Sequence, residues 1–238
     1  IKVYMNRNFT RWLLCMLVCM FSSATWALDQ VGGVYQIGTG QDLADFAALV
    51  NGGDVTANAV LTADIDYTGQ TAMIGSRSKR FAGTLDGQGH TITLDFTATA
   101  ENYSLFGYVC GAVRNLRVTG TVKAGVKLVG GIISNLYGGL LENCYCDVVM
   151  EISMTGDATC GGLVGRSGIA SSLRNCVFAG KLVGKAAQRC GGLIGWVEGS
   201  TSISNCLQLG EMDIDVNADS YALGRNSQKE GKINNCYV

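Results

Sequence analysis

The chain has 238 residues and a formal net charge of −1, with 47% hydrophobic and 16% charged residues. This composition excludes an intrinsically disordered chain, which would need low hydrophobicity, and argues against a nucleic-acid-binding protein, which would need a basic face. The 33 glycines and the lack of proline favour a fold with many tight corners, in which most backbone N–H groups pair between strands.

The N-terminal segment has the pattern of an export signal. Arg7 and Arg11 precede ten mostly apolar residues at 12–21, and a small-x-small cleavage sequence follows at 25–27. Ten apolar residues are too few to span a bilayer. Residues 1–27 are therefore predicted to be four read-through residues and a cleaved signal peptide. The mature chain is expected to be exported, either secreted or at the cell surface, with no membrane span.

Residues 28–81 are predicted to form an N-terminal cap and the first strands. Residues 31–37 resemble a short strand with a Gly-Gly turn. A helix is predicted over residues 42–51, where four apolar side chains recur at helical spacing, namely Leu43, Phe46, Ala47 and Val50. Because the first coil of a repeat stack has an uncovered hydrophobic end and unpaired strand edges, this helix is expected to cap that end.

Short strands are expected on both sides of a polar, basic loop at residues 76–80. One strand is predicted over residues 60–66 and a second over 73–75. After the loop, residues 81–92 read as a strand, a glycine turn and another strand.

The rest of the chain repeats. The sequence CGGLVG at residues 160–165 returns as CGGLIG at 190–195. An asparagine recurs alongside at steps of 28, 32, 30 and 30 residues, at Asn115, Asn143, Asn175, Asn205 and Asn235. A period this regular marks stacked copies of one structural unit. About thirty residues per copy predict an all-β fold over residues 82–238, a parallel β-helix of three short strands and three corners per coil. The asparagines are expected to form a hydrogen-bonded ladder at one corner.

The final copy stops two residues after Cys236, early in its third strand. Open strand edges can pair with another chain, and an uncovered apolar coil end lowers solubility. The chain is therefore expected either to be truncated at Val238 or to self-associate through its C-terminal coil.

Several motifs resemble those of GLUG-repeat proteins, which are exported bacterial β-solenoids. The Gly-Gly-Leu-Val-Gly of residues 161–165 is followed by Leu-Arg-Asn-Cys at 173–176, and residues 63–66 and 83–92 resemble the coils that precede such repeats. The resemblance extends from about residue 35 to residue 238. It implies a right-handed parallel β-helix of the pectate-lyase kind, and it implies no particular reaction, because these repeats occur in adhesin-like and protease-associated proteins.

Eight cysteines follow the predicted signal: Cys110, Cys144, Cys146, Cys160, Cys176, Cys190, Cys206 and Cys236. Six of them occupy two repeat positions, after the ladder asparagines or before the glycine pairs, and Leu116 takes the cysteine position in one copy. Leucine and cysteine exchange where a modest apolar group points into a core. Buried free thiols are therefore favoured over disulfides, although an exported protein could form disulfides. One histidine and no Cys-x-x-Cys pair argue against a metal or cofactor site.

No catalytic residues are expected. Chemistry on a glycosidic bond needs paired carboxylates or a base with metal-bound acids, and the glycine-rich repeat strands carry none. The best carboxylates elsewhere are Asp64, Asp66 and Asp86, and Asp86 and the single histidine, His90, are interpreted as structural parts of a corner. A polysaccharide lyase or glycoside hydrolase remains the alternative.

One candidate ligand stripe remains. Arg166, Trp196 and Arg225 each follow the repeat glycine in three successive coils, and outward-pointing side chains there would lie about 5 Å apart. Tryptophan and arginine can contact a glycan or an acidic chain, and the alternative is that the three are unrelated corner residues. The preferred function is a non-catalytic, adhesin-like or glycan-contacting module whose partners are glycans or host and cell-surface proteins. A spacer fragment of a larger surface protein is a further alternative.

Overall fold

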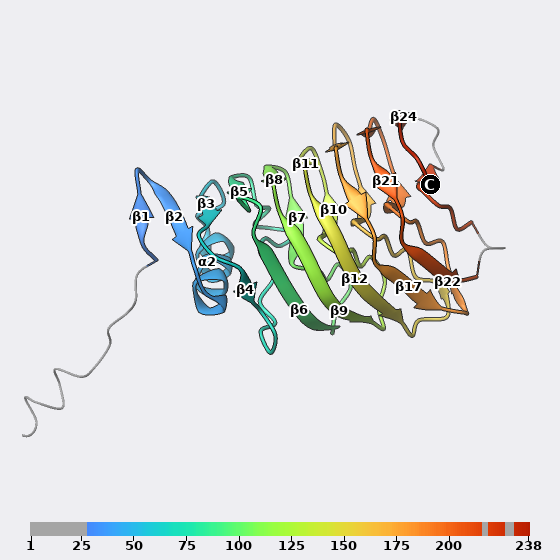
Figure 1. Cartoon of the computed structure of the whole chain (residues 1–238), viewed down its shortest axis with the longest axis horizontal. Helices are drawn as coiled ribbons and strands as arrows, with labels where there is room; N and C mark the ends of the chain where they lie inside the picture. The colour runs from blue at the N-terminus through green and yellow to red at the C-terminus, as the bar shows by residue number, and fades with distance from the viewer. Residues whose placement is uncertain (1–27, 216–218, 227–230) are drawn as a thin grey trace, which may run out of the picture.

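The computed structural model describes residues 28–215, 219–226 and 231–238, so the predicted export signal lies outside the described residues. The chain is mostly β, with 47% strand and 6% helix, and its parallel sheets form a solenoid of about seven turns with about 28 residues per turn. Figure 1 shows these turns, here called coils, stacked side by side along the long axis from the N-terminal to the C-terminal end. The predicted parallel β-solenoid is thus confirmed.

Three sheets run along the stack, and each coil adds strands to them. In the first sheet all neighbours are parallel except β1, which pairs antiparallel with β2 at the outer edge. Its strands in spatial order are β1 (Gln30–Val31), β2 (Val34–Ile37), β3 (Asn58–Leu61), β5 (Thr84–Asp86), β8 (Ala112–Arg114), β11 (Leu140–Glu142), β15 (Ser172–Arg174), β20 (Ser202–Ser204) and β24 (Lys232–Asn234).

The second sheet contains the glycine-rich repeats, and all its strands are parallel, with a one-residue register shift between the last two. Its strands are β7 (Phe106–Val109), β10 (Ile133–Leu136), β14 (Val164–Ser167), β19 (Ile194–Val197) and β23 (Gly224–Asn226). Isolated bridges join the glycine pairs of successive coils, from Gly130 to Gly161 and on to Gly191. The repeats recognised in the sequence therefore stack on one another, copy upon copy.

The third sheet has the longest strands. Its strands are β4 (Ile65–Asp66), β6 (Thr91–Ala98), β9 (Arg117–Ala124), β12 (Tyr145–Ile152), β16 (Val177–Phe178), β17 (Lys181–Gly184), β21 (Leu207–Gln208) and β22 (Glu211–Ile214). A separate two-stranded sheet is formed by β13 (Gly156–Asp157) and β18 (Ala187–Gln188), which follow β12 and β17 along the chain.

The helix α2 (Gly40–Gly52) lies between β2 and β3, slightly longer than the predicted 42–51. Thr39 caps it: the Thr39 side chain accepts a hydrogen bond from the Asp42 backbone N–H, and the Asp42 carboxylate accepts one from the Thr39 N–H. Gly53 ends the helix with a positive φ of 132°. The buried helix face includes Phe46, whose ring centroid lies 5.9 Å from that of Phe81. The helix thus belongs to the first coil and closes its core.

The strand predicted over residues 60–66 is wrong in one respect, because the chain turns a corner inside it. Residues up to Leu61 belong to β3 in the first sheet, and Ile65 begins β4 in the third. Both Leu61 and Ile65 are buried, so the apolar pattern continues through the corner and hides it. Residues 73–75 likewise contribute only an isolated bridge from Ile74 to Phe106.

One corner carries a continuous asparagine ladder. The five asparagines after β8, β11, β15, β20 and β24 all have a positive φ between 51° and 54°, a conformation that asparagine tolerates better than most residues. Each side-chain amide donates to the side-chain oxygen of the asparagine one coil earlier, over 3.1, 3.0, 3.2 and 2.8 Å. The first, Asn115, donates instead to Asp86 over 3.0 Å.

The cysteines that follow these asparagines point into the core. All eight described cysteines are free, and Cys144, Cys176 and Cys206 are buried. Each of these thiols donates to the backbone oxygen two residues earlier, as Cys176 does to Arg174 over 3.1 Å. Cys236 was expected to be buried with them but is only partly buried, because it lies in the last coil and has one stacked neighbour instead of two.

Candidate binding face

The second sheet aligns one residue from each of its five strands in a column. In register, this column consists of Tyr108, Asn135, Arg166, Trp196 and Arg225. Neighbouring parallel strands are about 4.8 Å apart, so the five side chains form a row about 20 Å long across the coils. We call this row the column face.

The repeat glycines explain why this position is displayed. In β7, β14 and β19 every residue is buried except the one that follows the glycine. A Cβ atom at Gly195 would lie 2.6 Å from the Gly165 backbone oxygen and 2.7 Å from that of Cys160, so no other residue fits without a shift of the backbone. The glycine lets adjacent coils approach closely, and in these three strands the next residue carries the partly exposed side chain. In β10, where Ser134 precedes Asn135, the Asn135 side chain is buried.

The structure brings the three predicted stripe residues into contact. The Arg166 guanidinium carbon lies 4.8 Å from the centre of the Trp196 ring, and that of Arg225 lies 5.0 Å from it. Because Arg166 and Arg225 come from the strands on either side of Trp196, their guanidinium groups cover both faces of the indole. Trp196 therefore lies between two guanidinium groups, and its ring faces are not free to stack on a sugar.

Arg166 is also tied to a carboxylate. Its Nε donates to Oε2 of Glu198 over 2.8 Å, and its Nη2 contacts the same oxygen. The Arg166 and Glu198 side chains are 31% and 23% exposed, so the pair is held at the surface and not buried. Within the parts of the chain that the structure describes, Nε of Arg225 is a buried nitrogen without a hydrogen-bond acceptor.

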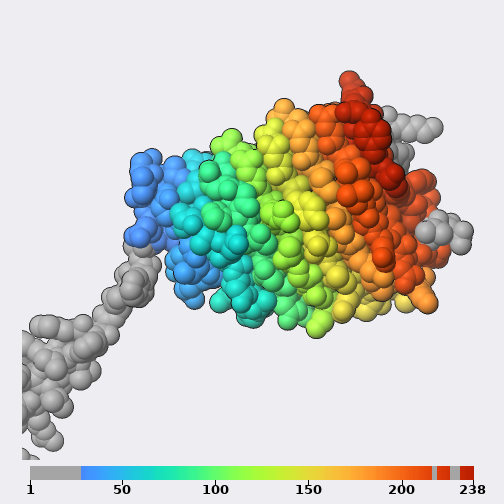
Figure 2. Space-filling view, viewed as in Figure 1, coloured from blue at the N-terminus to red at the C-terminus, as the bar shows by residue number. Residues whose placement is uncertain are grey.

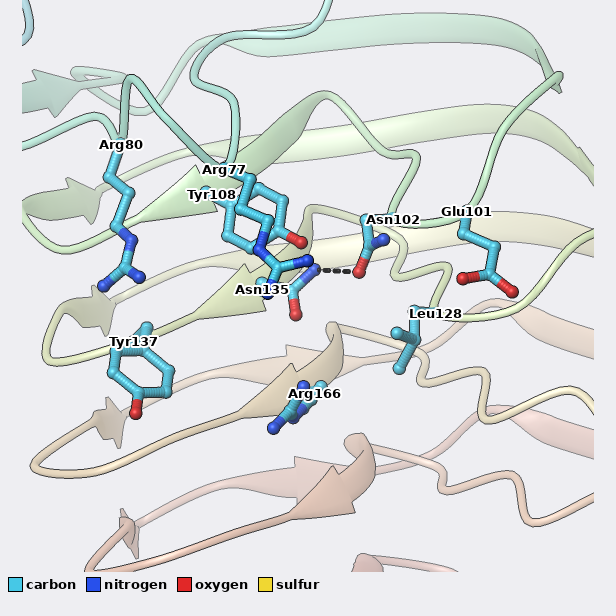
Figure 3. A pocket seen from close by; sticks show the side chains of 9 residues that line it. All are labelled: Arg77, Arg80, Glu101, Asn102, Tyr108, Leu128, Asn135, Tyr137 and Arg166. Atoms are coloured by element: carbon cyan, nitrogen blue, oxygen red, sulfur yellow. Dashed lines mark hydrogen bonds between the residues drawn. The ribbon is translucent and has the colours of Figure 1, made fainter.

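A pocket of about 330 Å³ opens beside the N-terminal half of the column face. We call it the arginine pocket, and Figure 3 shows its side chains converging from the loop at residues 76–80 and from the strands. Its lining includes Arg77, Arg80, Tyr108, Asn135, Tyr137 and Arg166.

The residues of the arginine pocket are held to different degrees. The Arg80 guanidinium carbon lies 4.9 Å from the centre of the Tyr137 ring. The Asn135 amide donates to the side-chain oxygen of Asn102 over 2.8 Å, the bond that is dashed in Figure 3. Arg77 is exposed and forms no ion pair, hydrogen bond or ring contact with any described residue. Glu101 is the acidic residue of the lining.

Sequence reasoning missed this pocket. The loop at 76–80 was recognised as basic but was not connected with the stripe, and Tyr108 was not placed in the column. The sequence does contain a pattern that points to Tyr108. Leu105-Phe106-Gly107 is a variant of the repeated Leu-Val-Gly sequence, and Tyr108 follows its glycine. That the loop lies beside the column depends on how the first coils stack, which the sequence pattern does not reveal.

The carboxylates considered for catalysis are engaged in structural contacts. Asp86 binds Arg114 over 2.9 Å and accepts bonds from Asn115 and the Gln88 backbone. Burial by itself raises the pKa of Asp86, but these bonds outweigh it and leave the pKa lowered. Asp66 accepts two bonds from Thr68, which lower its pKa.

His90 pairs with Asp64 at 3.2 Å. A backbone bond from Thr91 is the main cause of the lowered pKa of Asp64, and the contact with His90 adds to it. Among the described residues, no hydroxyl or thiol is hydrogen-bonded to the His90 ring, so a nucleophile and base pair is not assembled there. His90 and Asp86 lie beside the first and third sheets, and the structure does not bring them to the column face.

Three further observations concern charged contacts, metal binding and membrane spans. Asp157 lies between Lys127 and Arg189, at 2.9 and 2.8 Å, and tethers successive coils. In the described ranges no group of three or more histidine, cysteine, aspartate or glutamate side chains is placed to hold a metal ion. No described helix is long and apolar enough to cross a membrane.

Comparison with known proteins supports the fold. No family model matches the chain, and no curated protein matches it. Among solved structures, the chain is similar to a Bacteroides ovatus protein described as a "putative immunoglobulin A1 protease", with a TM-score of 0.55 and 19% sequence identity. The similarity covers 85% of this chain and 74% of that one. At this identity the likeness concerns the fold alone.

Proposed function

We propose that the protein is an exported, non-catalytic β-solenoid that binds a glycan along the column face. The observation that carries this proposal is the in-register row in which Trp196 holds the guanidinium groups of Arg166 and Arg225, one on each face of its ring. Guanidinium groups donate several fixed hydrogen bonds, which suit the closely spaced oxygens of an extended sugar chain. The adjoining arginine pocket can hold one unit of the sugar chain.

The contact that we propose differs from the stacking expected for a lone tryptophan. Since both faces of the Trp196 ring are covered by arginines, the ligand would meet the edges of the row and bind by hydrogen bonds. Tyr108 and Tyr137 supply the aromatic surface nearby. Trp196 is therefore assigned a positioning role.

Export, location at the cell surface and membership of the GLUG-repeat group belong to this proposal. The signal-like pattern at residues 7–27 supports export, and the repeated glycine and asparagine positions in a solenoid support the GLUG resemblance. Proteolysis, which the name of the structural neighbour suggests, and polysaccharide cleavage are not proposed for this chain. His90 pairs with Asp64 without an adjacent nucleophile, and Asp86 is committed to Arg114 and Asn115.

Binding to an array of immobilised glycans tests the proposal. The mature chain is expected to bind a subset of glycans, and Trp196→Ala is expected to weaken binding about tenfold because it releases both arginines. Tyr145→Ala is a matched control, since Arg117 lies 4.6 Å from the Tyr145 ring centre in the same kind of contact on the third sheet. Equal losses in the two variants, or no binding to any glycan, would contradict the proposal.

A further inference from the structure

The arginine pocket carries more positive charge than its own carboxylates balance. Three of its lining residues are arginines and one is a glutamate, Glu101. Arg166 is already paired with Glu198 on the column face. Arg77 and Arg80 have no carboxylate partner among the described residues, and Arg80 is instead stacked on Tyr137.

The local charge stands out against the rest of the chain. The formal net charge of the whole chain is −1, and three of the five other described arginines are paired with acids. Arg114 binds Asp86, Arg174 binds Glu142 and Arg189 binds Asp157. A cation that the fold does not neutralise, at the mouth of a concave site, is available to an anion from outside.

The geometry of the pocket limits the ligand to a small group on a larger molecule. Its volume of about 330 Å³ is at the lower end of the range for small-molecule sites, which suits one sugar unit. Arg166 belongs to both the pocket and the column face, so a sugar in the pocket could continue along the row toward Trp196.

We propose that the arginine pocket binds an oxyanion substituent, a carboxylate or a sulfate ester, on the glycan that the column face holds. This inference rests on the proposed glycan binding and adds the charge of the ligand to it. Arg77 and Arg80 line the pocket from the loop at residues 76–80, and Arg166 lines it from β14. The Asn135 amide already donates to Asn102 and Ser134, so the arginines supply the donors for the oxyanion. Guanidinium groups match the planar oxygens of a carboxylate and the oxygens of a sulfate.

Three tetrasaccharides test the inference by calorimetry with the mature chain. They are a galacturonate tetrasaccharide, which carries only carboxylates, a carrageenan tetrasaccharide, which carries only sulfate esters, and a neutral galactan tetrasaccharide. At least one acidic tetrasaccharide is expected to bind about tenfold more tightly than the neutral one, and its affinity is expected to fall as salt rises. Which acidic sugar binds more tightly identifies the oxyanion.

Variants of one loop locate the effect. Arg77→Gln and Arg80→Gln are each expected to weaken the acidic tetrasaccharide about tenfold and to leave the neutral one unchanged. Lys79→Gln is the matched control, because it removes one positive charge from the same loop, but its ammonium group lies beside Gly53 at the end of α2 and does not line the pocket. Unchanged thermal unfolding of all three variants would show that the loop is still folded.

The failure of this inference differs from the failure of the proposed function. Equal affinity for neutral and acidic tetrasaccharides, reduced by Trp196→Ala but not by Arg77→Gln, would leave glycan binding in place and overturn the oxyanion pocket. The same loss in Lys79→Gln as in Arg77→Gln would also overturn it, since diffuse charge would then explain the affinity. Binding of none of the three sugars, together with a silent glycan array, would overturn both.

Discussion

At the scale of single residues, the asparagine ladder combines a backbone and a side-chain requirement at each corner. Asn175 has a φ of 54°, donates to Asn143 over 3.0 Å and accepts from Asn205 over 3.2 Å. Asparagine adopts this left-handed conformation at lower cost than most residues, and its amide offers both a donor and an acceptor along the stack.

We predict that Asn175→Ala lowers the free energy of unfolding by about 2 kcal/mol, because it strains the left-handed corner and removes two exposed amide bonds. Asn175→Gly removes the bonds without the strain, so it should cost only about 1 kcal/mol. Urea unfolding of residues 28–238 measures both. Equal losses in the two variants would show that backbone strain contributes nothing at this corner.

Asp157 makes stability depend on pH. Burial alone raises the pKa of its carboxyl, but hydrogen bonds from Lys127, Thr159 and Arg189 outweigh burial and lower the pKa to about 2. A lowered pKa stabilises the fold above the unfolded value near 4, and this stabilisation is lost as the pH falls from about 4 to about 2.

We predict that Asp157→Asn lowers the free energy of unfolding at neutral pH by about 1–2 kcal/mol, a range that allows for the 30% exposure of this side chain. The difference from the unmodified protein should disappear as the pH approaches 2. Asp95→Asn removes a carboxylate that forms no ion pair with any described residue, so it is the control. Chemical unfolding between pH 2 and pH 7 provides the comparison, and a loss at neutral pH no larger than that of Asp95→Asn would contradict the prediction.

At the scale of elements, the sequence predicts the repeat strands better than the corners and loops around them. The spacing of the glycine pairs and asparagines fixes which residues stack, so the second sheet and the helix followed from the sequence. The corner inside residues 60–66 could not be seen, because Leu61 and Ile65 both point into the core on either side of it. The arginine pocket was missed because it depends on a loop and strands from different coils.

The fixed repeat period also allows part of the column face to be predicted. A fixed period places Arg166, Trp196 and Arg225 on adjacent strands, and register then makes them neighbours. Whether these neighbours stack on one another depends on their side-chain torsions, which periodicity does not describe. The covered indole faces are therefore a structural finding, and they change the expected contact with a ligand.

The glycine of the repeat strand offers a test at this scale. We predict that Gly195→Ala lowers the free energy of unfolding by about 1–3 kcal/mol, because the new Cβ would meet backbone oxygens at 2.6 and 2.7 Å and push two coils apart. Gly52→Ala in α2 is the matched control: a Cβ there meets no atom within 4 Å, so this change should be neutral or stabilise the helix. A neutral Gly195→Ala would show that the coils can separate at no cost.

At the scale of the whole molecule, the stack is uniform inside and open at its C-terminal end. In the first sheet, one inward column contains Leu85, Val113, Leu141, Leu173 and Ile203, all fully buried. The next member, Ile233, is 39% exposed. Figure 2 shows this last coil, in red, at the end of the molecule opposite the helix.

Other apolar side chains at this end of the stack are exposed as well. Leu209, Tyr221, Tyr237 and Val238 are between 50% and 75% exposed. Together with the outer edges of β22, β23 and β24, they form a surface with both apolar area and unpaired backbone groups. Such a surface favours association, because burying it removes apolar area from water and pairs strand edges.

We therefore predict that a chain of residues 28–238 self-associates through its C-terminal coil. Light scattering should report a mass that rises with concentration, and Ile233→Glu should shift it to the monomer, because a charge would be buried in the contact. Val149→Glu is the matched control, since Val149 is 38% exposed but lies on the third sheet in the middle of the stack, beside Lys181. A constant monomer mass at every concentration, or an equal effect of the two substitutions, would contradict association through this end.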